Sequence, residues 1–206
     1  MHTPILQVAE GQVTWKDMRV EIAGAGIIGL SIAWRLAQAG YQVVVRDAGR
    51  VAGESSWAGA GMLTPAGEFH EDSRWTQVAV QSLAEYGEFV EELTLATGVP
   101  IDFRVCGTME LAFNDAEKEA LDRPRPDGIY MEELTVSGAR YFAPIPTSGV
   151  RAARWFPNEA VVDPRNVCEA LVAAGKGADL LIHEVREWLQ ERLLVRAWRP
   201  DHSYAR

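Results

Sequence analysis

The stretch Val20-Glu-Ile-Ala-Gly24-Ala-Gly26-Ile-Ile-Gly29 decides the fold of this chain of 206 residues. Its first four residues predict a short β-strand, and the glycine-rich turn after them opens a helix. Apolar residues at Ile28, Ile32 and Leu36 recur every four positions, which places them on one face of that helix. The β-branched run at residues 43–45 predicts a second, buried strand. Strand, helix and strand in this order predict a βαβ unit and an α/β fold.

The glycines of this stretch fit the pattern G-x-G-x-x-G. Gly24 would make the tight turn, Gly26 would let a pyrophosphate approach the backbone, and Gly29 would let the helix pack closely on the strand. The free amides at the start of the helix would hold the phosphate charge. Asp47 lies 18 positions after Gly29, near the usual offset of about 20, and would accept hydrogen bonds from ribose hydroxyls. The alternative is a glycine-rich turn in some other α/β protein.

A run of small residues follows, Gly53-Glu-Ser-Ser-Trp-Ala-Gly-Ala-Gly-Met62. The βαβ unit alone does not separate NAD from FAD. FAD needs protein along its whole length, and a loop rich in Gly, Ala and Ser lets the backbone lie against the flavin. The segment therefore favours FAD, whereas on composition alone it is also typical of a flexible linker.

The rest of the chain alternates helical and strand-like patterns. Asn114 or Asp115 would cap a short helix, and Asp163-Pro164 is typical of a helix start. The Pro-rich residues 123–128 and the segment Tyr141–Pro146 predict loops. Helices are expected at residues 75–97 and from 164 to about 174, and strands at 108–113, 154–156, 180–188 and 192–198.

Composition excludes several classes of function. A net charge of −9 argues against general binding to nucleic acid or to anionic membranes, and no stretch reaches the roughly 18 apolar residues of a transmembrane helix. Cys106 and Cys168 fit no metal spacing and predict reduced, buried thiols in a cytoplasmic protein, with a disulfide or redox pair as the alternative. Residues 70–72 predict a solvated loop and no metal site. Arg151 and Arg154 could face an acidic substrate, but surface positions are commoner for arginine.

Three segments in the right order resemble the FAD-dependent D-amino-acid oxidase family: residues 24–36, Ser56–Pro65 and Val162–Arg165. Within the family, the sequence resembles the bacterial glycine oxidases of thiamine biosynthesis. The resemblance implies a glutathione-reductase-like FAD/NAD(P)-binding domain interleaved with an α+β substrate domain. By the same resemblance, we expect the C-terminal half of that fold to be missing from this sequence. It also predicts an N-terminal extension at residues 1–17. The FAD-binding domain would comprise residues 18–66 and 161–206, and the partial substrate domain residues 67–160.

By position, the resemblance also implies which residues contact FAD. The pyrophosphate loop and the ribose carboxylate come first, then the residues beside the flavin half, and last a backbone contact to the adenine. In that order the residues are Gly24, Ala25, Gly26, Ile28, Gly29 and Asp47, then Ser55, Ser56, Ala60, Gly61 and Met62, then Val185. No catalytic residue and no metal ligand is implied, because the flavin performs the chemistry.

The function implied by the resemblance is oxidative deamination of a small amino acid or secondary amine, with hydride transfer to the flavin and release of hydrogen peroxide. The partners would be the amino-acid substrate and dioxygen, with a homo-oligomer or a complementing second chain completing the assembly. Three alternatives stay open: a non-catalytic flavin-binding or nucleotide-binding fragment, a flavin-dependent dehydrogenase that uses quinone, and an NAD-dependent dehydrogenase. The small-residue segment argues against the last. The polar residues 199–206 suit a frameshift.

Overall fold

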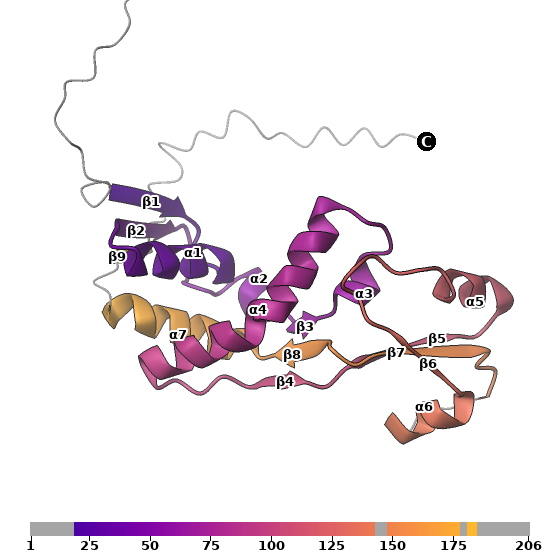
Figure 1. The fold of residues 1–206 in the computed structure, drawn as a ribbon. Helices are drawn as coiled ribbons and strands as arrows, with labels where there is room; N and C mark the ends of the chain where they lie inside the picture. The colour runs from indigo at the N-terminus through magenta and orange to yellow at the C-terminus, as the bar shows by residue number, and fades with distance from the viewer. Residues whose placement is uncertain (1–18, 143–147, 178–180, 185–206) are drawn as a thin grey trace, which may run out of the picture. The chain divides into compact units, whose positions relative to one another are not determined.

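The computed structural model describes residues 19–142, 148–177 and 181–184. They belong to two compact units, each of which is treated by itself. The first, called the nucleotide unit below, comprises Met1–Trp57 and Leu171–Arg206, and the second, the inserted unit, comprises Ala58–Ala170. Figure 1 gives the elements of both. The chain therefore leaves the nucleotide unit after Trp57 and returns to it at Leu171. The domain boundaries predicted from the sequence stay predictions.

A parallel sheet in the order β1-β2-β9 forms the described part of the nucleotide unit. Its strands are β1 (Arg19–Ala23), β2 (Gln42–Asp47) and β9 (Leu181–Glu184), and the helix α1 (Ile27–Gln38) connects the first two. Val20 pairs with Val43, and Val45 pairs with Ile182. Parallel pairing across a helical crossover confirms the predicted βαβ unit. The side chains at 43–45 are buried, as continuous β-branching predicts for a sheet covered on both faces.

The buried face of α1 is not the one that carries Ile28 and Ile32. Ile28 is 74% exposed and Ile32 is 49% exposed, whereas Leu30, Ala33 and Trp34 are buried. Both sets recur at helical spacing, so periodicity fits either face. The face turned inward is the one next to Gly29, because there a side chain is absent and the helix can approach the strand closely. Ile28 and Ile32 therefore lie on an exposed face of the helix.

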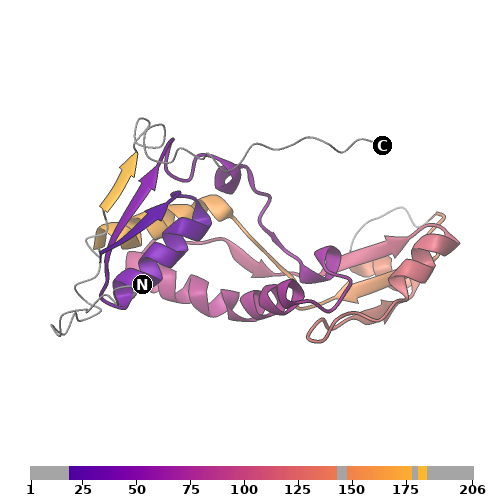
Figure 2. The same cartoon turned by 90° about the horizontal axis from the view of Figure 1, so that it is seen from above.

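The inserted unit is built from two small antiparallel sheets and four described helices that begin and end within it (Figure 2). One sheet has the order β3-β8-β4 and the other β5-β7-β6. The helices α5 and α6 lie against the second sheet. The strands are β3 (Met62–Leu63), β4 (Phe103–Val105), β5 (Thr108–Ala112), β6 (Glu132–Leu134), β7 (Ala152–Phe156) and β8 (Ala160–Val162), and the helices are α3 (Pro65–Glu68), α4 (Arg74–Thr97), α5 (Asp115–Leu121) and α6 (Val136–Phe142). Two further helices cross the boundary between the units, α2 (Ser55–Ala58) and α7 (Pro164–Gly177).

Capping residues mark the ends of α4 and the start of α5. The Ser73 side chain accepts a hydrogen bond from the Thr76 amide and caps α4, and Gly98 ends that helix in the left-handed conformation. Asn114 caps α5 by accepting from the Glu117 amide. The predicted helix at 75–97 and the cap at residue 114 are therefore confirmed.

Several short elements were not predicted. The strands β3, β4, β6 and β8 and the helices α2, α3 and α6 have two to seven residues each, too few to show a hydrophobic period. Tyr141 and Phe142 belong to α6, so the predicted loop from Tyr141 begins too early. The strand expected at 192–198 lies outside the described residues. No described helix combines the length and the apolar character needed to cross a membrane.

Candidate functional site

The turn between β1 and α1 has the geometry expected of a nucleotide-binding loop. The Gly24 amide donates to the carbonyl of Arg46 at 2.7 Å, which fixes the loop to the neighbouring strand β2. A Cβ atom on Gly29 would lie 2.0 Å from the Gly24 carbonyl oxygen, so only glycine allows α1 to pack this close to the strand. The first residue before the helix, Gly26, is extended and offers no side-chain cap. The loop therefore brings the open end of α1 next to the carboxyl ends of β1 and β2.

Protein oxygen atoms already accept two of the loop's amide hydrogens. The Ala25 amide donates to Asp47 Oδ2 at 2.6 Å, and the Ile27 amide donates to Ser56 Oγ at 3.0 Å. The other carboxylate oxygen, Asp47 Oδ1, accepts from the Gly49 amide at 2.8 Å. Each carboxylate oxygen can accept a second hydrogen bond, so Asp47 keeps capacity for a hydroxyl donor.

The remaining amides of the loop are open. Among the described residues, none accepts a hydrogen bond from the amides of Gly26, Ile28 or Gly29. No acidic side chain lies in the first turn of α1, so none of the helix's own residues competes for the positive end of its dipole. A site with open amides at a helix start, and a carboxylate at the end of the next strand, can bind a phosphate group and a sugar hydroxyl side by side. These residues fit a dinucleotide cofactor.

The predicted flavin-side residues are divided between the two units. Ser55 and Ser56 belong to the nucleotide unit, and the Ser56 hydroxyl lies at the start of α1 rather than away from the phosphate loop. Ala60, Gly61 and Met62 belong to the inserted unit.

Within the inserted unit, Gly61 is constrained by the protein itself. Its φ is +73°, and a Cβ there would lie 1.8 Å from the Val162 carbonyl oxygen. Ala60 is exposed and the side chain of Met62 is 63% exposed, so both can be reached by a ligand. Val185 lies outside the described residues.

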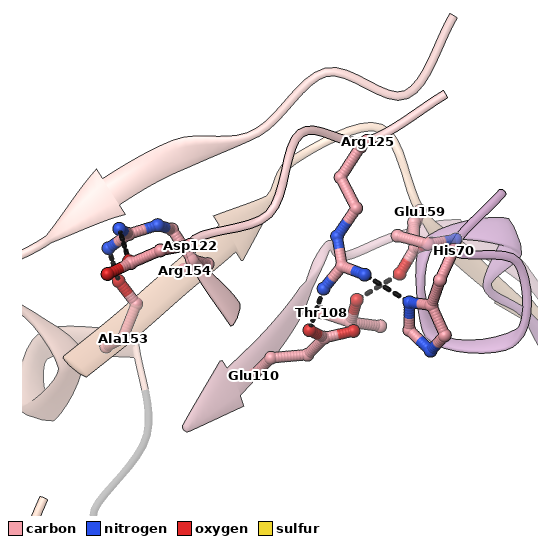
Figure 3. Close-up of polar contacts among 9 residues, drawn as sticks. His70, Thr108, Glu110, Asp122, Arg125, Ala153, Arg154 and Glu159 are labelled. Atoms are coloured by element: carbon pink, nitrogen blue, oxygen red, sulfur yellow. Dashed lines mark hydrogen bonds and ion pairs between the residues drawn. The ribbon is translucent and has the colours of Figure 1, made fainter. Parts of the chain in front are cut away.

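A buried polar cluster in the inserted unit was missed by the sequence analysis (Figure 3). Glu159 accepts from the Ala66 amide at 2.7 Å and from the Thr108 hydroxyl. Arg125 forms an ion pair with Glu110 and contacts the ring of His70, which lies in an exposed loop as predicted. The cluster joins residues far apart in the chain, and no local pattern marks them.

Burial raises the pKa of the Glu159 carboxyl above its ordinary value. Two hydrogen bonds and two charges modify this effect: the Thr108 and Ala66 donors lower the pKa, Glu110 raises it and Arg125 lowers it. Desolvation is the largest of these causes, because the side chain lies where water cannot stabilise the charge. This carboxyl therefore holds its proton to a higher pH than an exposed glutamate does.

Three further residues differ from the sequence predictions. Arg154 is 9% exposed and pairs with Asp122 and Glu133, so a surface position was wrong for it. Cys168 is buried, and burial raises the pKa of its thiol. Cys106 is exposed, so the prediction of two buried thiols was wrong for that residue.

Comparison with known proteins agrees with this geometry. The glycine oxidase of Bacillus licheniformis is 30% identical over 168 residues, which cover 81% of this chain and 44% of that protein. The crystal structure of glycine oxidase from Geobacillus kaustophilus superposes with a TM-score of 0.75 at 29% identity, covering 81% of this chain and 46% of the other. L-α-glycerophosphate oxidase from Mycoplasma pneumoniae, solved with FAD bound, shares the fold alone, with a TM-score of 0.66 at 18% identity over 80% of this chain and 44% of that one.

These matches confirm the predicted fold class and set its extent. The chain spans less than half the length of the relatives that it matches. A model of the DAO family, described as FAD dependent oxidoreductase, matches residues 19–200. The chain therefore belongs to the DAO family of FAD dependent oxidoreductases.

Proposed function

We propose that this chain binds FAD through the nucleotide unit. The observation that carries the proposal is the set of open amides at Gly26, Ile28 and Gly29, at the start of a helix whose first turn has no acidic side chain. These amides would hold the pyrophosphate, and Asp47 would accept hydrogen bonds from the ribose at the end of β2. Membership of a family of FAD dependent oxidoreductases supports FAD as the dinucleotide.

We further propose that the flavin half extends toward the small-residue segment. Ser55 and Ser56 would face the cofactor beyond the phosphates, and Ala60, Gly61 and Met62 would approach the flavin. The exposure of Ala60 and Met62 supports this assignment. Val185 keeps its predicted role toward the adenine as a proposal.

The proposed reaction is the oxidation of glycine or another small amine. In balanced form, glycine, dioxygen and water give glyoxylate, ammonia and hydrogen peroxide. Bound FAD would supply the hydride acceptor and pass both electrons to dioxygen. The chain's residues would bind the cofactor and orient its reactive face, which is where positioning lowers the barrier. The names of the relatives, glycine oxidases at about 30% identity, support this substrate class.

Cofactor binding and turnover are separate proposals for this chain, because it covers 44% of the first relative's length. FAD binding without peroxide production is the second candidate function. A quinone-linked dehydrogenase would reduce an artificial electron acceptor with glycine and produce no peroxide. The cytoplasmic location and the homo-oligomer or complementing chain stay predictions.

A titration with FAD tests the first proposal. The purified chain is mixed with FAD and passed through a desalting column, and its visible absorption spectrum is recorded. Retained flavin with a structured absorption band is the expected result, whereas flavin that washes out overturns the proposal. Peroxide production with glycine or sarcosine then distinguishes an oxidase from a chain that only binds flavin.

A pair of matched variants locates the site. Gly26→Glu places a carboxylate beside the open amides, where a Cβ meets only the flexible Ser56 hydroxyl at 3.1 Å. Loss of about two charge-assisted hydrogen bonds would weaken FAD binding roughly a hundredfold. Gly177→Glu makes the same change in open space and should leave the affinity unchanged. Equal affinity of the two variants would exclude the loop as the FAD site.

A further inference from the structure

Glu159 ties three segments of the inserted unit together. The residue lies in the turn between β7 and β8, and it is 4% exposed. Its side chain accepts from the Ala66 amide at 2.7 Å and from the Thr108 hydroxyl, as Figure 3 shows for Thr108. Its backbone carbonyl accepts from the amides of Cys106 at 3.2 Å and Gly107 at 2.8 Å. One residue therefore joins the start of α3, the turn before β5 and the turn before β8.

The residues after Glu159 hold the segment Gly61–Ala66 along its length. The Val162 amide donates to the Gly61 carbonyl at 2.9 Å. The strands β3 and β8 then pair antiparallel, with Met62 opposite Val161 and Leu63 opposite Ala160. The hydrogen bond from the Ala66 amide to Glu159 closes the far end of this ladder. The segment is thus fixed at both ends by residues 159–162.

A buried carboxylate at this position costs free energy. Burial of a charge costs several kcal/mol before its partners compensate, and a leucine or methionine would fill similar space without that cost. The two side-chain hydrogen bonds partly offset the cost of burying Glu159. The position therefore favours a residue that fixes a geometry over one that only fills space.

Truncation of Glu159 would remove the acceptor of the Ala66 amide. Glu159 lies in the wall of a pocket of about 200 Å³, together with Pro65, Leu83 and Phe156. Shortening the side chain to alanine would extend this pocket, because Glu159 forms part of its wall. The Ala66 amide would then lose its acceptor, and the end of the segment would move more freely.

We infer that Glu159 is a positioning residue for the flavin-side segment Gly61–Ala66, acting through the Ala66 amide. The inference rests on the proposed function, in which this segment approaches the flavin. It goes beyond that proposal by assigning the shape of the segment to a side chain on another turn, 93 residues along the chain from Ala66. Glu159 does not touch the cofactor in this scheme.

Hydrogen exchange of the full chain without FAD tests directly whether Glu159 restrains this segment. In Glu159→Ala, the amides between Met62 and Ala66 should exchange about tenfold faster, because a hydrogen bond and its support are lost. Glu159→Gln should restore slow exchange, since its oxygen can accept from Ala66 and its amide can donate to the Thr108 hydroxyl. Unchanged exchange in Glu159→Ala would overturn the inference.

A destabilised control separates positioning from loss of stability. Leu121 lies in a small core cluster with Ala112 and Ala152, away from the segment along the chain, and Leu121→Ala should cost about 2–5 kcal/mol. FAD affinity should fall about tenfold in Glu159→Ala, recover in Glu159→Gln and stay unchanged in Leu121→Ala, at a temperature where all three are folded. An equal fall in Leu121→Ala would overturn the positioning role. Failure of the wild-type chain to bind FAD would instead reject the proposed function. The exchange data would still show whether Glu159 restrains the segment Gly61–Ala66.

Discussion

The substitution Gly29→Ala should destabilise the nucleotide unit by an amount that the structure allows to be estimated. The new Cβ would lie 2.0 Å from the Gly24 carbonyl oxygen and 3.1 Å from its carbon. Because Cβ contacts under 3.0 Å are essentially never found, α1 must move away from β1 by about 1 Å. Overpacking of this kind costs up to about 3 kcal/mol, and the backbone oxygen cannot rotate away as a side chain would. The better helix propensity of alanine returns about 1 kcal/mol, which leaves a net cost of about 2 kcal/mol.

Thermal unfolding followed by circular dichroism measures this cost. For a chain of this size, 2 kcal/mol corresponds to a fall in Tm of about 4–8 °C. Gly177→Ala is the matched control, because a Cβ there meets nothing within 4 Å, and its Tm should equal or slightly exceed that of the wild type. If Gly29→Ala unfolds at the same temperature as this control, the close approach of α1 to the Gly24 carbonyl does not stabilise the unit.

Three further outcomes follow from the inserted unit. Gly61→Ala combines a φ of +73° with a contact of 1.8 Å to the Val162 carbonyl, so its Tm should fall more than that of Gly29→Ala in the same assay. Burial raises the pKa of Glu159, so its proton stabilises the folded state at low pH, and this stabilisation is lost as pH rises through the raised pKa. Relative to Glu159→Gln, the wild-type free energy of unfolding should therefore fall as pH rises above the ordinary glutamate pKa, as urea titrations at several pH values would show. A thiol reagent should modify Cys106 quickly and Cys168 only on unfolding, which mass spectrometry of the labelled peptides would show; equal rates would contradict the described burial.

The βαβ unit was predictable because its signals are local. Three glycines at fixed spacing, a β-branched run and an acid at the end of the second strand all lie within 28 residues, from Val20 to Asp47. Each signal corresponds to one feature of the structure: the turn at Gly24, the close packing at Gly29 and the Asp47 carboxylate beside the loop. The direction in which α1 faces was not predictable, since apolar residues recur on two of its faces and tertiary packing chose between them.

The buried cluster around Glu159 shows why the rest could not be predicted. Its members come from the helix α3, the strand β5, the turn between β7 and β8 and a Pro-rich loop, and the hydrogen bond between Glu159 and Ala66 spans 93 residues. Acidic residues and arginines are usually exposed, so their sequence positions give no warning of burial. The strands β3 and β8 have two and three residues, too short to alternate detectably. Long-range pairing alone brings these groups together.

The glycines of this chain differ in what they can reveal about the cofactor. Gly29 and Gly61 are each required by a backbone carbonyl oxygen of their own unit, at 2.0 Å and 1.8 Å from the missing Cβ. A substitution at either position therefore disrupts the packing of its own unit. Any loss of FAD binding in such a variant would reflect the disrupted fold and would not test the contact with the cofactor. At Gly26 a Cβ meets only the Ser56 hydroxyl, which can rotate away, so the backbone can accommodate a side chain. Substitution at Gly26 is consequently the change that tests ligand binding itself, because it alters the space in front of the open amides while the helix stays on its strand.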